Sequence, residues 1–124
     1  MSFGYKVLGF GSGGGAAPYQ ISYLVVGGGG SANGNNSGGG GGGGMRTSTA
    51  EFSIGTSYTV TVGAGASANT DSGEANNSAL TGSDITAIES AAGGRGAGLL
   101  SQGDAGGAGG GSGGNTQPGG EGNT

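Results

Sequence analysis

Apolar side chains are sparse along this chain, and they gather in short runs that predict β-strands. The clearest run covers residues 21–26, where β-branched and aromatic residues are stopped by four glycines. A second run covers residues 57–62, with Tyr58, Val60 and Val62 on one face and polar residues on the other. Both runs are too short for a helix, so the pattern predicts an all-β protein.

Weaker apolar patterns flank these two strands. Residues 49–54 alternate in the same way, and Gly55-Thr56 supplies a turn, so the pattern predicts a hairpin between 49–54 and 57–62. Residues 78–80 are a further strand candidate. Residues 85–88 place two isoleucines three positions apart, which suits either a helical turn or an irregular strand.

Glycine divides the chain into regions. Of the 124 residues 38 are glycine, with 12 among residues 27–44, 15 among residues 93–124 and only 5 among residues 51–92. We interpret residues 1–20 as an N-terminal arm that could serve as an anchor. Residues 21–92 then form a β-rich, glycine-rich domain, and residues 93–124 form a glycine-rich C-terminal segment.

The glycine runs limit how the chain can be ordered. Collagen is excluded, because glycines stand seven in a row at 38–44 and there are two prolines. The remaining readings are packed polyglycine-II segments that bond sideways, glycine loops ordered by their neighbours, and flexible linkers. Leu, Ile, Val and Phe total 17, too few for a full core. We therefore expect a small β-sandwich-like scaffold that is stabilised by other copies of the chain or by packing in a larger particle.

The polar composition removes most chemistry. The chain has no His, Cys or Trp, and its three basic and seven acidic residues give a net charge of -4 without a charge run. These counts predict no enzyme activity, no catalytic residues, no cofactor or metal site, and no binding of nucleic acid. No apolar stretch is long enough to insert into a membrane, and the N-terminus lacks the pattern of a signal peptide.

Four short motifs match the residue patterns of known sites but lack the context that those sites require. Residues 27–32 fit a dinucleotide fingerprint, but helix-breaking residues follow them. Residues 110–114 fit the serine-hydrolase elbow, but no histidine exists to act as its base. The sequons at 35–37 and 76–78 are read as loop asparagines, and residues 100–104 carry an unrepeated fragment of a calcium-binding repeat.

Aromatic residues fall into two groups. One group precedes the first clear strand and is either a docking arm or a cover for the edge of the chain's own sheet; it comprises Phe3, Tyr5, Phe10 and Tyr19. The other lies in the predicted strands and is expected to be core rather than a ligand platform; it comprises Tyr23, Phe52 and Tyr58.

Several segments in order resemble a known family. They read YLVVGGGG at 23–30, seven glycines followed by Met45-Arg46, TVTVGAG at 59–65, and GGRG at 93–96. Over residues 20–114 this order resembles the glycine-rich domain of bacteriophage tail-fibre and related virion proteins. The resemblance implies a trimeric or otherwise self-associating virion component, made in the host cytoplasm, with glycine-rich loops or polyglycine helices on a small β scaffold.

The resemblance implies a structural virion protein, a tail-fibre or appendage subunit that contributes to host attachment. Its partners would be other copies and other virion proteins. Alternatives are a distal adhesin that binds a host surface glycan or protein through residues 69–77, a capsid decoration or head-fibre protein, and a cellular glycine-rich surface protein, which would need an export signal.

Overall fold

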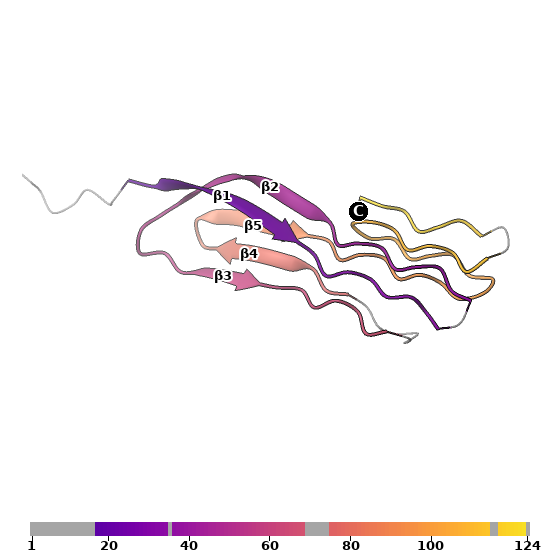
Figure 1. The fold of residues 1–124 in the computed structure, drawn as a ribbon. Helices are drawn as coiled ribbons and strands as arrows, with labels where there is room; N and C mark the ends of the chain where they lie inside the picture. Colours follow the sequence, from indigo (N-terminus) through magenta and orange to yellow (C-terminus); the bar gives the residue numbers. More distant parts are fainter. Residues whose placement is uncertain (1–16, 35, 69–74, 115–116, 124) are drawn as a thin grey trace, which may run out of the picture.

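The computed structural model describes residues 17–34, 36–68, 75–114 and 117–123, and it is all-β (Figure 1). Two antiparallel sheets have the orders β1-β2 and β3-β4-β5, and the described residues contain no helix. The strands are β1 (Tyr19–Val26), β2 (Met45–Phe52), β3 (Tyr58–Thr61), β4 (Ser78–Gly82) and β5 (Ile85–Ser90). The all-β prediction is therefore confirmed.

The individual strand predictions hold to within a few residues, except that β2 begins earlier than expected. β1 begins two residues before the predicted 21–26, and β4 and β5 each extend two residues past their predicted ends. The segment at 85–88 is a strand rather than a helical turn. Its pairing with β4 shifts register between Leu80 and Gly82, next to the tight connection from β4 to β5.

The predicted hairpin between 49–54 and 57–62 is wrong. β2 pairs with β1 along its whole length, with Val26 opposite Met45, and β3 pairs with β4. The β1-β2 pairing continues past the strands, where the Gly27 N–H donates to the Gly44 carbonyl at 3.0 Å. The two glycine segments thus extend the β1-β2 ladder, while the turn at Gly55, with φ +87°, carries the chain from one sheet to the other.

The core between the two sheets is small. β2 contacts β5, and β1 contacts both β4 and β5. Phe52 is 3% exposed and Ile88 7% exposed. The Phe52 ring lies between two tyrosines, with ring centroids 6.3 Å from Tyr19 and 4.3 Å from Tyr58. Phe52 is therefore the centre of the packing, as its strand position predicted.

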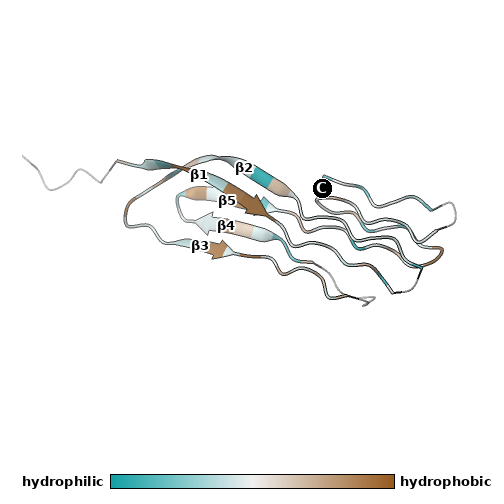
Figure 2. Cartoon of the chain, viewed as in Figure 1, coloured by the Kyte–Doolittle hydropathy of each residue, from teal (hydrophilic) through white to brown (hydrophobic). Residues whose placement is uncertain are grey.

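Large apolar side chains on both sheets remain exposed. Figure 2 shows hydrophobic residues along β1 and β3. Leu24 and Met45, on β1 and β2, are 63% and 70% exposed. Val60 on β3 is 70% exposed as well. Exposed apolar surface of this kind commonly marks a contact with another molecule.

Beyond the strands, the chain forms long extended segments that lie side by side and make up the other half of the molecule (Figure 1). Those without regular strand pairing cover residues 27–32, 38–44, 91–98, 102–107, 108–113 and 117–123. We call these segments the glycine bundle. The molecule is thus elongated, with the two sheets at one end and the glycine bundle at the other.

Candidate functional site

Hydrogen bonds between segments of the glycine bundle recur at every third residue. Segment 38–44 donates three of them to segment 91–98, at 3.0, 2.7 and 2.8 Å. The donor and acceptor pairs are Gly38 and Ala97, Gly41 and Gly94, and Gly44 and Ala91. A chain with three residues per turn points equivalent groups in the same direction at this interval. The segments are therefore joined by backbone groups and need no side chains for it.

The same interval joins segment 91–98 to its other neighbours. Gly93 and Gly96 donate to residues 28 and 31, both at 2.8 Å. Gly94 and Ala97 donate to residues 108 and 111, both at 2.9 Å. Residues 104 and 107 donate back to the carbonyls of residues 95 and 92. Segment 91–98 is thus bonded to four other segments and is the centre of the glycine bundle.

Burial follows the same threefold interval. Gly93, Gly94, Gly96 and Ala97 are buried, whereas residues 92, 95 and 98 between them are partly exposed. Two of the three faces of this segment are therefore packed, and the third accepts a large side chain. Arg95 occupies that third face, which explains how an arginine fits into an otherwise glycine-rich segment.

Close approach explains why glycine is required on the packed faces. A Cβ added to Gly41 would lie 2.7 Å from the Gly109 carbonyl oxygen, and one added to Gly43 would lie 2.9 Å from the Gly27 Cα. At Gly39 and Gly42, by contrast, it would meet nothing within 4 Å. Segment 38–44 therefore has two packed faces and one open face.

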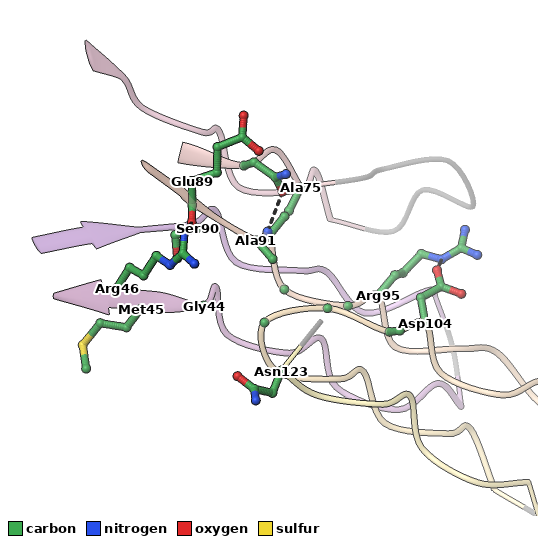
Figure 3. Close-up of a pocket in the computed structure, with 17 residues that line it drawn as sticks. Gly44, Met45, Arg46, Ala75, Glu89, Ser90, Ala91, Arg95, Asp104 and Asn123 are labelled. Atoms are coloured by element: carbon green, nitrogen blue, oxygen red, sulfur yellow. Dashed lines mark hydrogen bonds and ion pairs between the residues drawn. The ribbon is translucent and has the colours of Figure 1, made fainter. Parts of the chain in front are cut away.

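A hollow of about 820 Å³ lies where the sheets meet the glycine bundle (Figure 3). Arg46 and Glu89 line one part of it, and Arg95 and Asp104 line another. The Arg95 Nε lies 3.0 Å from the Asp104 Oδ2, and the Arg46 guanidinium donates to the Glu89 carbonyl at 3.3 Å. Both guanidinium groups are therefore already engaged by groups of the chain itself.

A polar cluster closes the turn between the two sheets. The Tyr58 hydroxyl donates to the Asp84 Oδ2 at 2.6 Å, and the Ser53 N–H donates to the same hydroxyl at 2.8 Å. Desolvation, followed by the hydrogen bond to Asp84, raises the pKa of Tyr58. The hydrogen bond from Tyr58 lowers the pKa of Asp84. This cluster stabilises the connection between β2 and β3.

The motifs matched by letter have structural roles in the described residues. Residues 27–32 are extended and bonded to neighbouring segments, with no helix following them among the residues the structure describes. Gly110, in the elbow-like run 110–114, packs against the Arg95 carbonyl. Asn77, in the second sequon, accepts a hydrogen bond from the Ala92 N–H at 2.8 Å, and Ser78 accepts one from the Gly63 N–H at 2.9 Å.

The other sequence expectations have mixed outcomes. Phe3, Tyr5, Phe10, Asn35 and most of the predicted binding loop 69–77 lie outside the described residues. Tyr19 lies in β1, where it covers Phe52 and is itself 44% exposed. Within the described part of the chain, no cluster of three or more potential metal ligands occurs. The same part contains no helix that could cross a membrane.

The threefold burial pattern is what sequence reasoning missed. The signal was present as the spacing of side chains in segment 91–98, where Ala92 and Arg95 stand three apart among glycines. The segment 45–48 at the start of β2 was also missed, because its polar residues show no apolar alternation.

Comparison with known proteins gives a family but no individual relative. No curated protein and no solved structure matches the chain. The family model described as "Glycine-rich domain" matches residues 4–124, which is nearly the entire chain. The match spans both sheets and the whole glycine bundle, and the chain therefore belongs to the glycine-rich domain family.

Proposed function

We propose that this chain is a non-enzymatic structural protein of a bacteriophage virion, a tail-fibre or appendage subunit that contributes to host attachment. In this proposal the segments of the glycine bundle are polyglycine-II helices packed side by side. Other copies of the chain and other virion proteins are its partners, and the assembled particle is where it functions.

The hydrogen bonds at every third residue are the observation that carries the proposal. Segment 38–44 bonds to three other segments through main-chain groups, and its packed glycines leave no room for a Cβ. Such packing makes a stiff body from backbone alone, because every bonded segment is held by neighbours on several sides. Stiffness with few charged groups suits a component that holds its shape outside a cell.

The resemblance to tail-fibre glycine-rich domains supplies the virion part of the proposal. The order of strand, glycine run, strand and glycine run on which the resemblance rests is also the order in which the sheets and the glycine bundle are built. The exposed apolar side chains on both sheets further suit a subunit that is covered by partners in an assembly.

Particle composition tests the virion assignment. Particles produced from the genome that encodes the chain are purified on a density gradient and analysed by mass spectrometry, and antibodies to the chain are used for immunogold electron microscopy. We expect the chain to co-purify with the particles and the gold to label a tail fibre or appendage. A chain found only in the soluble lysate, with unlabelled particles, contradicts the proposal.

A distal adhesin is the second candidate, and one observation favours it. Leu99 and Leu100 are 58% and 62% exposed in a turn of the glycine bundle at the end away from the sheets. Leu100 has φ +73°, a backbone conformation in which leucine is unusual. An exposed apolar pair held in an unfavourable conformation at a tip is a reasonable contact for a host receptor.

Replacing the tip tests the adhesin candidate. In a Leu99→Ser, Leu100→Asn variant the apolar pair is lost, while asparagine tolerates positive φ and keeps the turn. An adhesin role predicts that the purified wild-type chain binds host cells and that this variant does not, with an unchanged melting temperature. Equal binding by both proteins, or binding by neither, contradicts this candidate.

A further inference from the structure

Segment 38–44 is an edge of the glycine bundle, with neighbours on one side only. Its N–H groups at every third residue bond to segment 91–98. The carbonyls of Gly41 and Gly44 accept from segment 27–32, and those of Gly39 and Gly42 accept from segment 108–113. The segment therefore has three bonded neighbours in the glycine bundle. The direction of its other backbone N–H and C=O groups decides what it can bind.

Peptide geometry gives that direction. In a trans peptide the N–H and the C=O of one unit point in opposite directions, and the described residues contain no cis bond. The Gly42 N–H belongs to the same unit as the Gly41 carbonyl, so it points away from segment 27–32. The Gly40 carbonyl belongs to the same unit as the Gly41 N–H, so it points away from segment 91–98.

These outward groups have no backbone partner in the described part of the chain. This holds for the N–H groups of Gly39 and Gly42 and for the carbonyls of Gly40 and Gly43. Each pair is spaced by three residues, so the open side repeats donors and acceptors at the interval that joins the segments inside the glycine bundle. It is the counterpart of an unpaired β-sheet edge.

The open side continues onto an apolar part of the sheet. Arg46 reaches the Glu89 carbonyl on β5, so its neighbour Met45 points to the opposite, outer face of β2. Val26 is the register partner of Met45, and Leu24 shares that face of β1. We call this surface the bare-glycine face; it comprises Leu24, Val26, Gly39, Gly42 and Met45, all of them exposed and uncharged.

The chemistry of the bare-glycine face selects its partner. A partner chain must bring its own N–H and C=O groups to the edge at intervals of three residues, and Cβ atoms would hold its backbone away. A β-strand does not match, because its bonding groups alternate with a period of two. The partner must therefore be a glycine-rich extended chain, and segment 38–44 itself meets that requirement.

We infer that the bare-glycine face binds a second copy of this chain, edge segment against edge segment, with the apolar residues of β1 and β2 packing alongside. The inference rests on the proposed structural function, since it names the surface through which copies meet. The contacts inside the glycine bundle show that the required fit is attainable, because Gly41 already packs against the backbone at residues 108–109.

Sedimentation of the full chain tests the inference, with Gly42→Lys as the blocking variant. A side chain at 42 meets nothing within 4 Å in the monomer, so the monomer keeps its fold while the face is obstructed. Thr59→Lys is the control, because it adds the same charge at an exposed position of β3, which lies in the other sheet. Amide exchange at Gly94 and circular dichroism report whether each monomer is intact.

We expect the wild type and Thr59→Lys to associate between about 10 μM and about 1 mM, the range for modest interfaces. Gly42→Lys is expected to stay monomeric with unchanged amide exchange, and Met45→Ser to associate at least about tenfold more weakly, a difference of about 1.4 kcal/mol. The inference is overturned if the wild type is monomeric throughout, if Gly42→Lys associates like wild type, or if Thr59→Lys loses association equally.

The result separates this inference from the proposed function. Association that is lost only in Gly42→Lys, by a chain absent from virus particles, supports the inference and contradicts the virion assignment. A chain that is found on particles but is monomeric at every concentration supports the virion assignment and contradicts the inference.

Discussion

Replacing Gly41 by alanine is expected to destabilise the protein, whereas the same replacement at Gly42 is not. The two positions are adjacent in the same run of seven glycines, so composition and local sequence are matched. An added Cβ at Gly41 would lie 2.7 Å from both the Ala108 carbonyl carbon and the Gly109 carbonyl oxygen. The same atom at Gly42 meets nothing within 4 Å.

The expected cost at Gly41 comes from the displacement that the methyl group forces. Ordinary contact begins at 3.4 Å, and the Ala108 carbonyl oxygen lies even closer to the added Cβ than these two atoms. The neighbouring backbone must therefore retreat by more than 0.7 Å, which is 3.4 minus 2.7. That retreat strains two hydrogen bonds of Gly41, to Gly94 at 2.7 Å and from Gly30 at 2.8 Å. Overpacking costs about 1–3 kcal/mol and each lost bond about 0.5–1.5 kcal/mol, so we expect a loss of about 2–4 kcal/mol.

The effect at Gly42 has the opposite sign. Its φ is not in the positive region, so alanine fits the backbone and mainly reduces the entropy of the unfolded chain. We therefore expect Gly42→Ala to raise stability by about 0.4–1 kcal/mol. Urea unfolding and calorimetry of both variants measure the difference. Amide exchange at Gly44, whose N–H donates to the Ala91 carbonyl, shows whether the contact between segments 38–44 and 91–98 has loosened. Free energies of unfolding for the two variants that agree within about 0.5 kcal/mol would refute the packing argument.

Three further predictions address the sheets and the polar groups. Phe52→Ala should cost about 3–5 kcal/mol in urea unfolding because Phe52 is buried between two tyrosines, whereas Ile54→Ala, at an exposed position, should change stability by less than about 0.5 kcal/mol. Ser31→Ala should be neutral or stabilising by up to about 1 kcal/mol, since the buried Ser31 Oγ has no hydrogen-bond partner among the described residues; a clear loss of stability would reveal one. The hydrogen bond from Tyr58 lowers the pKa of Asp84, so this pair stabilises the fold above the unfolded pKa of 3.8, and that stability is lost as the pH falls through the lower folded pKa. Asp84→Asn should therefore flatten the acid dependence of the urea midpoint. An unchanged pH profile would contradict the assignment.

The strands were predictable because their signal is local. Tyr58, Val60 and the apolar run at 21–26 alternate or cluster as strand residues do, and the structure places strands there. Pairing was less predictable. The turn at Gly55 suggested a hairpin, but β1 and β2 are joined through two glycine segments that extend their ladder, and a nearby turn residue carries no information about that longer contact.

The candidate site was only partly predictable for a similar reason. Packed glycine segments were one of three forms expected for the glycine runs, and the absence of His and Cys directed attention to the backbone. Neither feature shows which glycines are packed. Gly41 and Gly42 are identical in sequence context, yet one faces segment 108–113 and the other faces outward.

By itself, the sequence determined that this protein is all-β with a small core and that glycine backbone, rather than side-chain chemistry, dominates its build. Those properties follow from composition and from patterns of a few residues. Only the tertiary structure decided which strands pair, which face of each glycine segment is packed, and that segment 38–44 is an edge. Glycine has no side chain with which to encode a neighbour, so the identity of that neighbour depends on backbone groups brought together from distant parts of the chain.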